Sequence, residues 1–288
     1  MGTAPALLRK WQWLRHQPAY RNSPTRVAFR LLAWRAYCWA GRAAVVALPT
    51  FGVRLWLPPH WRGVAKLIYA FREEYEPELR YLWSMLRAGD AVVDVGASFG
   101  LYSLVAASRV GPAGRVLAFE PARASYDILC RNVELNGYHW LRASQFALAD
   151  RRGEAALYHY PDPSKNSLGA TREALSHEQV VVRTLDDVLD MGDIPGRLAA
   201  VKIDVEGAES LVLQGAQRTI AQFRPLIIFE VNPDAARQLG SEPDAVWSLL
   251  ETWNYRFFRL AEGGPLQPLA APPPGGNVIA LPGSRGLA

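Results

Sequence analysis

The chain has 288 residues, half of them apolar, which is enough for one large domain or one domain with an extension. Its formal net charge of +5 combines 32 Lys and Arg with 27 Asp and Glu. Two cysteines cannot build a disulfide framework, and we expect no secretory signal. The composition therefore argues against a secreted protein stabilised by disulfides and predicts a cytoplasmic one.

The positive charge is concentrated in residues 1–72, which hold 12 Lys and Arg and no Asp or Glu. The rest of the chain has 20 basic and 27 acidic residues, a net charge of 20 − 27 = −7. Six of the ten tryptophans also fall in the basic segment: Trp11, Trp13, Trp34, Trp39, Trp56 and Trp61. Basic residues interleaved with Trp suit an anionic membrane surface. Nucleic acid is the other partner that such a composition serves, and we do not expect it here.

Two secondary-structure elements are expected in the basic segment, a helix over residues 25–47 and a short strand over 51–57. The apolar run 31–48 is interrupted by Arg35 and Arg42, which lie one heptad apart and so near one helical face. This pattern favours a helix lying in a membrane interface at the inner face of the membrane over one that spans the bilayer. Over either kind of membrane contact we favour a helical cap, residues 1–72, whose arginines pair with the acidic domain 73–288.

Strand-like and helical segments alternate from residue 73 onward, beginning with a helix at 73–86. Strands are expected at 91–95, 115–119, 144–148, 200–205 and 226–231, and helices at 101–110, 123–136, 208–223 and 234–253. An antiparallel pair is expected at 154–160 and 179–183, and an antiparallel edge hairpin at 255–260 and 277–281. This alternation predicts an α/β fold with a doubly wound, mostly parallel seven-stranded sheet and an antiparallel edge strand, preceded by a helical N-terminal extension.

The segment AVVDVGASFG, residues 91–100, reads as a buried strand that runs into a glycine-bearing turn. The next strand ends on Glu120, twenty residues past Gly100. A strand, a tight turn, a helix and a strand tipped by a carboxylate together predict a nucleotide-ribose site. A dinucleotide turn would need Gly-x-Gly-x-x-Gly, whereas the corresponding positions are Gly96, Ser98 and Leu101, so that pattern fails.

Acidic side chains gather at the carboxyl ends of later strands, where ligands bind in a doubly wound sheet. Asp204 and Glu206 end the fourth strand, and Glu230 ends the fifth. Lys202, Asp204 and Glu206 alternate onto one face, and three charges there are costly unless they are paired or used. For Lys202 we favour a structural ion pair with Asp94 or Glu230. For Asp204 and Glu206 we favour a functional role.

Six short motifs resemble, in chain order, those of the FkbM-type methyltransferases. They are DVGASFG from Asp94, FEP from Phe119, NSL from Asn166, TLDD from Thr184, KIDVEGAE from Lys202 and FE from Phe229. The similarity covers about residues 73–232, and KIDVEG is its most specific element. The resemblance implies a Rossmann-like methyltransferase fold and S-adenosylmethionine (SAM) as methyl donor. It also implies a hydroxyl acceptor on a sugar or other glycan, a lipid-linked compound or a secondary metabolite.

Site residues follow from this resemblance. The expected SAM-binding residues are Asp94, Gly96, Ala97, Ser98 and Gly100 around the methionine half, Glu120 and Pro121 at the ribose, and Ala147 at the adenine edge. Asn166 and Ser167 are the expected substrate contacts.

The catalytic candidates follow from their strand-end positions. Asp204 and Glu206 are candidates for the base and for positioning the acceptor, and Glu230 for a substrate or supporting partner. The same three carboxylates could instead hold Mg²⁺ together with water molecules.

Two other classes of function stay open at this point. An NAD- or nucleotide-sugar-dependent oxidoreductase would share the ribose carboxylate, although the missing third glycine argues against it. A non-catalytic, membrane-associated module would keep the fold and use the basic, Trp-rich segment for attachment. Such a module predicts no binding of SAM.

Overall fold

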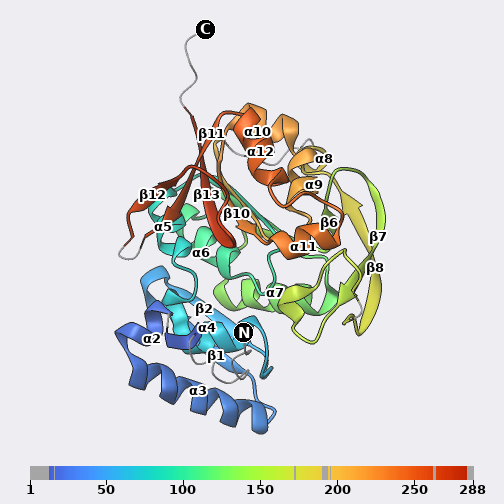
Figure 1. The fold of residues 1–288 in the computed structure, drawn as a ribbon. Helices are drawn as coiled ribbons and strands as arrows, with labels where there is room; N and C mark the ends of the chain where they lie inside the picture. Colours follow the sequence, from blue (N-terminus) through green and yellow to red (C-terminus); the bar gives the residue numbers. More distant parts are fainter. Residues whose placement is uncertain are drawn as a thin grey trace, which may run out of the picture. The chain divides into compact units, whose positions relative to one another are not determined.

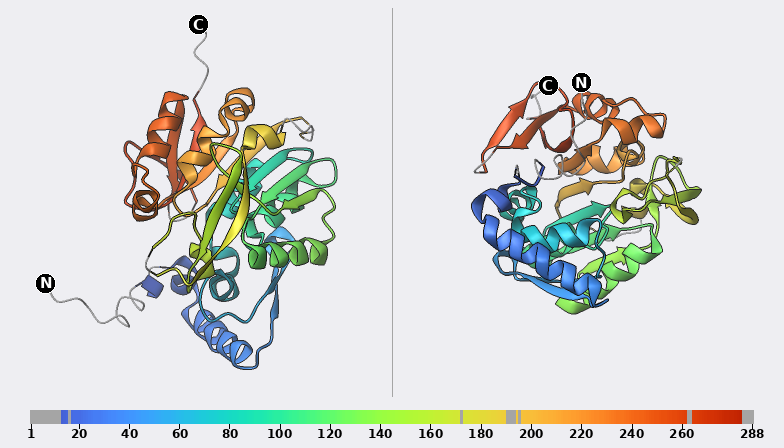
Figure 2. Two further views of the ribbon diagram at one scale, coloured as in Figure 1. Left: turned by 90° about the vertical axis from the view of Figure 1, so that its right-hand side faces the viewer. Right: turned by 60° about the horizontal axis from the view of Figure 1, so that its bottom comes forward.

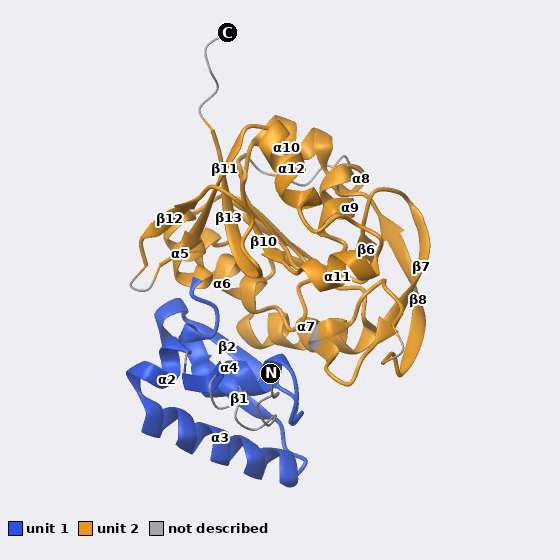
Figure 3. Cartoon of the chain, viewed as in Figure 1, with its two compact units in different colours: residues 1–77 blue, residues 78–288 orange. Residues whose placement is uncertain are grey.

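The computed structural model describes residues 13–15, 17–171, 173–189, 194, 196–261 and 264–283. The chain divides into two compact units, residues 1–77 and 78–288 (Figure 3). The boundary therefore falls after Pro77, whereas the change in charge falls at Glu73. Trp11, one of the six tryptophans of the basic segment, lies outside the described residues.

The N-terminal unit combines helices with a two-stranded antiparallel sheet. Its elements are α2 (Pro18–Asn22), α3 (Pro24–Trp39), β1 (Ala44–Leu48), β2 (Val53–Leu57) and α4 (Val64–Phe71). The helix expected over 25–47 is wrong in its second half, because β1 alternates between buried and exposed residues and pairs with β2. Arg42 consequently lies beyond the end of α3 and does not share a helical face with Arg35.

The larger unit is built on a sheet that has eight strands in the described residues (Figure 1). Their spatial order is β12 (Leu266–Leu269), β11 (Tyr255–Leu260), β13 (Gly276–Pro282), β10 (Leu226–Val231), β9 (Leu198–Ile203), β3 (Ala91–Val95), β4 (Arg115–Phe119) and β5 (Leu141–Ser144). The five strands from β10 to β5 are parallel. The doubly wound, mostly parallel α/β sheet predicted from the sequence is thus confirmed.

The antiparallel end of the sheet differs from the expectation. β13 pairs with β11, as the hairpin prediction requires, but its other side pairs with β10, so it lies inside the sheet. The Gly/Pro-rich stretch between them contributes β12, which is the edge strand and brings the number of strands to eight instead of seven. The pairing of β13 with β10 joins strands across a long connection, and such pairing leaves no local sequence pattern.

Helices cover both faces of the sheet, with α6 (Leu101–Val110) and α7 (Arg123–Asn136) on one side and α10 (Gln217–Phe223) and α12 (Ala245–Thr252) on the other (Figures 1 and 2). Three expected helices are shorter or split. The helix expected at 73–86 is α5 (Glu78–Met85), which begins after Pro77. The helix expected at 208–223 is divided into α9 (Glu209–Gln214) and α10, and the one expected at 234–253 into α11 (Pro233–Gln238) and α12. A short helix, α8 (Leu185–Leu189), follows Thr184. Among the described residues, none of the helices combines the length and apolar character needed to cross a bilayer.

A second, three-stranded sheet has the order β6 (Ala147–Leu148), β8 (Ser176–Arg183) and β7 (Gly153–His159). The antiparallel pairing of β7 with β8 agrees with the expected pair. The strand expected at 144–148 is divided, because β5 ends at Ser144 in the large sheet whereas β6 pairs with β8 in the small one.

The chain order reverses between β3 and β9. From β3 it runs outward through β4 to β5, and from β9 it runs the other way to β10. All five residues of β3 are buried, as expected for a central parallel strand. The carboxyl ends of β3 and β9 therefore meet at the switch point, where doubly wound sheets bind their ligands.

Candidate functional site

The turn after β3 passes unusually close to the end of β9. Gly96 has a φ of +78°, and a Cβ atom there would lie 1.8 Å from the backbone oxygen of Asp204. Gly100 has a φ of +86°, and a Cβ there would lie 2.5 Å from Cδ1 of Leu129. Only glycine meets both constraints, the left-handed backbone and the close contact. Gly96 thus lets the β3 turn approach the acidic end of β9, and Gly100 lets the same turn pack against Leu129 of α7.

The amide groups of this turn are engaged within the protein. The N–H groups of Gly96 and Ala97 both donate to the carbonyl oxygen of Phe119, at 2.9 and 3.0 Å. The N–H of Ser98, which also has a positive φ, donates to Oε2 of Glu120 at 2.8 Å. A phosphate cradle would need such amides directed at the ligand. The turn is instead fastened to the end of β4.

Asp94 is buried at the end of β3, with 2% of its surface exposed. Its Oδ2 accepts a hydrogen bond of 2.5 Å from the hydroxyl of Ser103 in α6. Burial raises the pKa of Asp94 to about 6, although the Ser103 hydrogen bond and the charge of Lys202 oppose the shift. The carboxyl group therefore lies beside the turn and ionises at a higher pH than an ordinary aspartate.

Glu120 is the carboxylate at the end of β4, and 7% of its surface is exposed. Its two oxygens accept from the N–H groups of Ser98, at 2.8 Å, and Ala122, at 2.9 Å. Burial raises its pKa to about 7, and the two backbone hydrogen bonds oppose that shift. Pro121, the next residue, is half-buried. Glu120 thus lies at the end of β4 beside the β3 turn, and both of its carboxylate oxygens already accept hydrogen bonds.

Three acidic side chains converge beyond the ends of β9 and β10. One carboxylate oxygen from each of Asp204, Glu206 and Glu230 can be chosen so that all three lie within 4.8 Å of one another. Asp204 and Glu206 follow β9, whereas Glu230 lies near the end of the neighbouring parallel strand β10, so the pairing of β9 with β10 brings Glu230 to the other two. Oxygen ligands in such a group could hold a hard divalent cation, or the carboxylates could share protons.

Lys202 supplies positive charge to this acidic cluster. Its side chain is 3% exposed, and its Nζ lies 3.1 Å from Oδ2 of Asp204, whose side chain is 41% exposed. The ammonium also lies 5.1 Å from the ring centroid of Tyr102 in α6. Lys202 is level with Asp94 in the β3–β9 ladder. Lys202 therefore pairs with Asp204, a partner that was not expected from the sequence, and its charge also lowers the pKa of Asp94 and Glu230, the partners that were expected.

Glu206 has the most strongly raised pKa of the acidic cluster, about 8, because of burial and the charges of Glu230 and Asp204. Its backbone is left-handed, with a φ of +51°. The side-chain amide of Asn232 donates to its Oε2 at 3.2 Å, and the hydroxyl of Ser167 donates to its backbone oxygen at 2.8 Å. A non-glycine residue held in this conformation at a strand end is typical of a functional turn.

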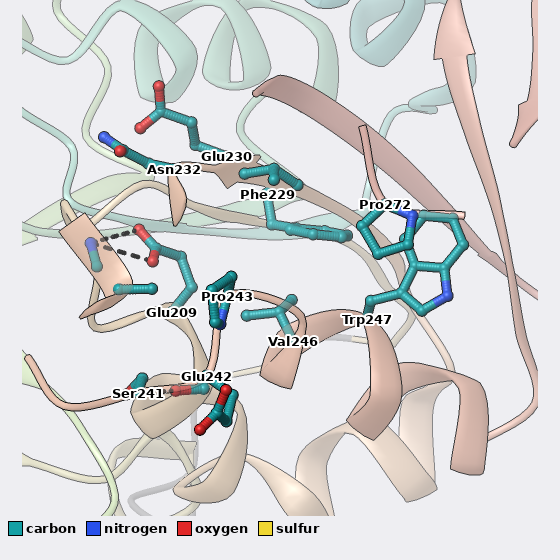
Figure 4. Close-up of a pocket in the computed structure, with 14 residues that line it drawn as sticks. Glu209, Phe229, Glu230, Asn232, Ser241, Glu242, Pro243, Val246, Trp247 and Pro272 are labelled. Carbon is teal, nitrogen blue, oxygen red and sulfur yellow. Dashed lines mark hydrogen bonds between the residues drawn. The ribbon is translucent and has the colours of Figure 1, made fainter. Parts of the chain in front are cut away.

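Glu230 and its neighbour Phe229 point to opposite sides of β10. Figure 4 shows Phe229 directed toward Trp247 and Pro272, which line a pocket, while the carboxylate of Glu230 points away from them. Burial and the charge of Asp204 raise the pKa of Glu230 to about 7. Its Oε2 is buried without a hydrogen-bond partner in the described part of the chain. The described residues thus leave this one oxygen of Glu230 without a donor, while Asn232 forms a side-chain hydrogen bond with the same carboxyl group.

Glu209 holds the turn that carries Glu206. Glu209 is 4% exposed, and its carboxylate accepts from the N–H of Val205 at 3.0 Å. It also accepts from the N–H of Gly207 at 3.1 Å, as Figure 4 shows. A Cβ on Gly207 would lie 2.4 Å from the backbone oxygen of Ala235. The segment that follows Lys202 therefore contains two residues of the acidic cluster, Asp204 and Glu206, and two that shape the turn, Gly207 and Glu209.

The expected substrate residues lie in the loop between β7 and β8. Oδ1 of Asn166 accepts from the backbone N–H of Tyr160 at 3.2 Å, so its side chain shapes the loop. Ser167 is buried and joins the loop to Glu206 through the hydrogen bond described above. Ala147 is also buried, in β6 of the small sheet, in a cluster that contains Ala122. Ser167 is thus directly linked to Glu206 of the acidic cluster, whereas Asn166 binds within its own loop and Ala147 packs in the core beside the small sheet.

Three further contacts were not anticipated from the sequence. Ser103 binds Asp94, Tyr102 lies beside Lys202, and Asn232 binds Glu206. Asn232 follows Glu230 by two residues, so the alternation of a strand could have placed both on one face. Tyr102 and Ser103 begin α6, and only the packing of that helix on the sheet brings them to the site.

A family model described as the methyltransferase FkbM domain matches residues 94–257 of this chain. The chain is 35% identical over 145 residues to Methyltransferase 1 of Beauveria bassiana, a match that covers 43% of this chain and 57% of that protein. It is 30% identical over 166 residues to the 31-O-demethyl-FK506 methyltransferase FkbM of Streptomyces tacrolimicus, covering 56% of this chain and 63% of that protein. The matches thus span about six tenths of these relatives' own length.

Solved structures with a similar fold include a methyltransferase FkbM from Methylobacillus flagellatus, with a TM-score of 0.43 and 19% identity. That alignment covers 75% of this chain and 53% of the other. A structure described as a putative O-methyltransferase from Klebsiella pneumoniae aligns over 96% of this chain and all of its own, with a TM-score of 0.46 and 14% identity. At these values neither likeness supports a statement about function.

Proposed function

Because this chain belongs to the methyltransferase FkbM family, we propose that it transfers a methyl group from SAM to a hydroxyl of a small-molecule or glycan acceptor. The observation that carries the proposal is the close approach of Gly96 to Asp204. This contact places a turn suited to a nucleoside ligand directly against a cluster of acidic side chains. Cofactor binding and acceptor activation would then occur at one switch point.

The residues that would hold SAM are those of the β3 turn, from Asp94 to Gly100, together with Glu120 at the ribose. Their chemistry fits, because buried carboxylates accept hydroxyl and ammonium hydrogen bonds well. The turn amides of Gly96, Ala97 and Ser98 already donate within the protein, which disfavours a pyrophosphate ligand and hence an NAD-dependent enzyme. When bound, the sulfonium of SAM supplies an electrophilic methyl group.

The acidic cluster supports a role in activating the acceptor. A general base works best when its pKa lies near the working pH, and that of Glu206 is raised to about 8. Glu206 would take the proton of the acceptor hydroxyl. Asp204, held by Lys202, would orient the acceptor, and Glu230 would accept a further hydrogen bond from it. The name of the Streptomyces relative, a 31-O-demethyl-FK506 methyltransferase, also supports an oxygen as the acceptor atom.

Mg²⁺ is a second candidate occupant of the acidic cluster, because three carboxylate oxygens lie within 4.8 Å of one another. The Lys202 ammonium already compensates part of their charge, at 3.1 Å from Asp204, which favours the proton-transfer role over the metal site. Dialysis against EDTA separates the two roles. We expect full turnover after dialysis, whereas loss of turnover that returns with Mg²⁺ would favour the metal.

The proposal is tested by titrating the purified full-length chain with SAM and, separately, with NAD in a calorimeter. We expect saturable binding of SAM and none of NAD. Incubation with isotopically labelled SAM and a bacterial extract, followed by mass spectrometry, should then yield a product that has gained one labelled methyl group, and fragmentation should place that group on oxygen. Binding of NAD alone would contradict the proposal.

A further inference from the structure

Helix α3 packs on the rest of the N-terminal unit through one face. Val27 and Trp34, seven positions apart, are 1% and 0% exposed. The indole N–H of Trp34 donates to the backbone oxygen of His60 at 3.0 Å, and its ring lies 4.9 Å from that of Tyr69. These contacts fix which side of α3 faces the unit's own core.

The opposite face of α3 carries large apolar side chains that are exposed. Phe29 is 72% exposed, Leu32 is 69% exposed and Trp39 is 91% exposed. They lie three and then seven positions apart, a spacing that places residues on one face of a helix. The helix therefore has two apolar faces, and the described part of the chain covers only the one with Val27 and Trp34.

Basic residues accompany the exposed apolar face. Arg26 and Arg35 are both exposed on α3, and the guanidinium of Arg35 lies 5.8 Å from the ring of Trp61, whose exposure is 46%. The helix itself has no acidic residue. Residues 1–77 contain 12 basic and three acidic residues, a net charge of 12 − 3 = +9. Two of those acids, Glu73 and Glu74, already bind Thr50 and Asn22.

The positive charges crowd one another. Burial lowers the pKa of Arg30, and neighbouring Arg26 lowers it further. The pKa of Arg72 is lowered in the same way by burial and by the charge of Arg30. An anionic surface would relieve this repulsion, so charge complementarity favours an acidic partner. Exposed Trp and Phe between arginines select, among acidic partners, a lipid headgroup layer.

We propose that the exposed face of α3 binds the surface of an anionic lipid bilayer. Phe29, Leu32 and Trp39 would enter the boundary between headgroups and acyl chains, and Arg26 and Arg35 would contact lipid phosphates. The helix has 16 residues and is about 24 Å long at 1.5 Å per residue, so it lies along the surface and does not cross it. An enzyme held in this way would meet acceptors that are themselves lipid-linked.

The test is co-sedimentation of the full-length chain with vesicles of 70% phosphatidylcholine and 30% phosphatidylserine, compared with vesicles of phosphatidylcholine alone. We expect binding to the anionic vesicles and at least about tenfold weaker binding to the neutral ones. The triple variant Phe29→Ser, Leu32→Ser, Trp39→Ser and the double variant Arg26→Glu, Arg35→Glu should each lose at least about tenfold in partition coefficient. Val45→Ser is the control, because Val45 is 57% exposed on β1, outside the helix.

All of these side chains are on the surface, so the variants should keep the circular dichroism spectrum and SAM affinity of the wild type. Wild-type binding by the triple variant, or equal binding of the wild type to both kinds of vesicle, would overturn the proposal. Light scattering tests whether a second copy of the chain covers this face instead. A dimer that becomes a monomer in the triple variant would also overturn the bilayer assignment.

Discussion

The buried ammonium of Lys202 lies 3.1 Å from a carboxylate oxygen of Asp204 that is partly open to solvent. The two residues are two positions apart, where β9 gives way to the acidic turn. Lys202 is also level with Asp94 on β3 and lowers the pKa of Asp94, Glu78 and Glu230. One cation therefore holds negative charge on both sides of the switch point, at the proposed cofactor turn and in the acidic cluster.

Lys202→Met should remove this charge with little change in side-chain volume. The carboxylates around it then become harder to ionise, so the acidic limb of the pH–rate profile should move to higher pH. Turnover at pH 7 should fall about 10²–10⁴-fold if the carboxylates act in proton transfer. Rates measured from pH 5 to 10 check this. A uniform loss of rate with an unshifted profile would mean that Lys202 acts only in folding.

Gly96→Ala should destabilise the fold far more than a glycine substitution normally does. The added Cβ would lie 1.8 Å from the Asp204 backbone oxygen, and both segments are fixed by hydrogen bonds. The matched control is Gly111→Ala, which has a similar left-handed φ, +65°, and no atom within 4 Å of the added Cβ. We expect about 1 kcal/mol for the control and at least about 3 kcal/mol for Gly96→Ala. Urea unfolding gives both values, and equal losses would refute the close contact.

Glu120→Gln should weaken SAM binding about 10–100-fold, because a carboxylate that accepts from hydroxyl groups contributes more than a neutral amide. The fold should be retained, as the amide oxygen can still accept from Ser98 or Ala122. Isothermal titration of SAM gives the affinities. Unchanged affinity would remove Glu120 from the ribose site.

The raised pKa of Glu120 leads us to expect that SAM binding releases protons. Burial raises the pKa of Glu120 to about 7, so the group is partly protonated at pH 6.5 and must ionise to bind hydroxyl donors. Titrations at pH 6.5 in buffers of different ionisation enthalpy measure the protons released. We expect a release that disappears in Glu120→Gln. Equal heats in all buffers would show that the bound form keeps its proton.

The parallel part of the sheet and the ends of its strands could be predicted from the sequence because both are local. Buried runs such as Ala91–Val95 and strand-end acids such as Glu120 follow from periodicity and turn chemistry. The place of β13 between β10 and β11 could not, since it depends on pairing across a long connection. The contact of Ser103 with Asp94 likewise depends on how α6 packs on β3. For Lys202 the sequence suggested partners on neighbouring strands and missed Asp204, which lies just past the end of β9.

Glu206 gives a prediction for stability as well as for catalysis. Its pKa is about 4.5 in the unfolded chain and about 8 in the folded one, so between these values the folded state binds the extra proton. This group's contribution to the free energy of unfolding is therefore complete below pH 4.5 and is lost as the pH rises through 8. Glu206→Gln has no group that titrates at this position. The free energy of unfolding of the variant minus that of the wild type should therefore rise with pH, by at least about 1 kcal/mol between pH 5.5 and 9. Urea unfolding of both proteins at the two pH values measures this difference. A constant difference would mean that Glu206 is ionised throughout, and it could then not serve as a base with a pKa near 8.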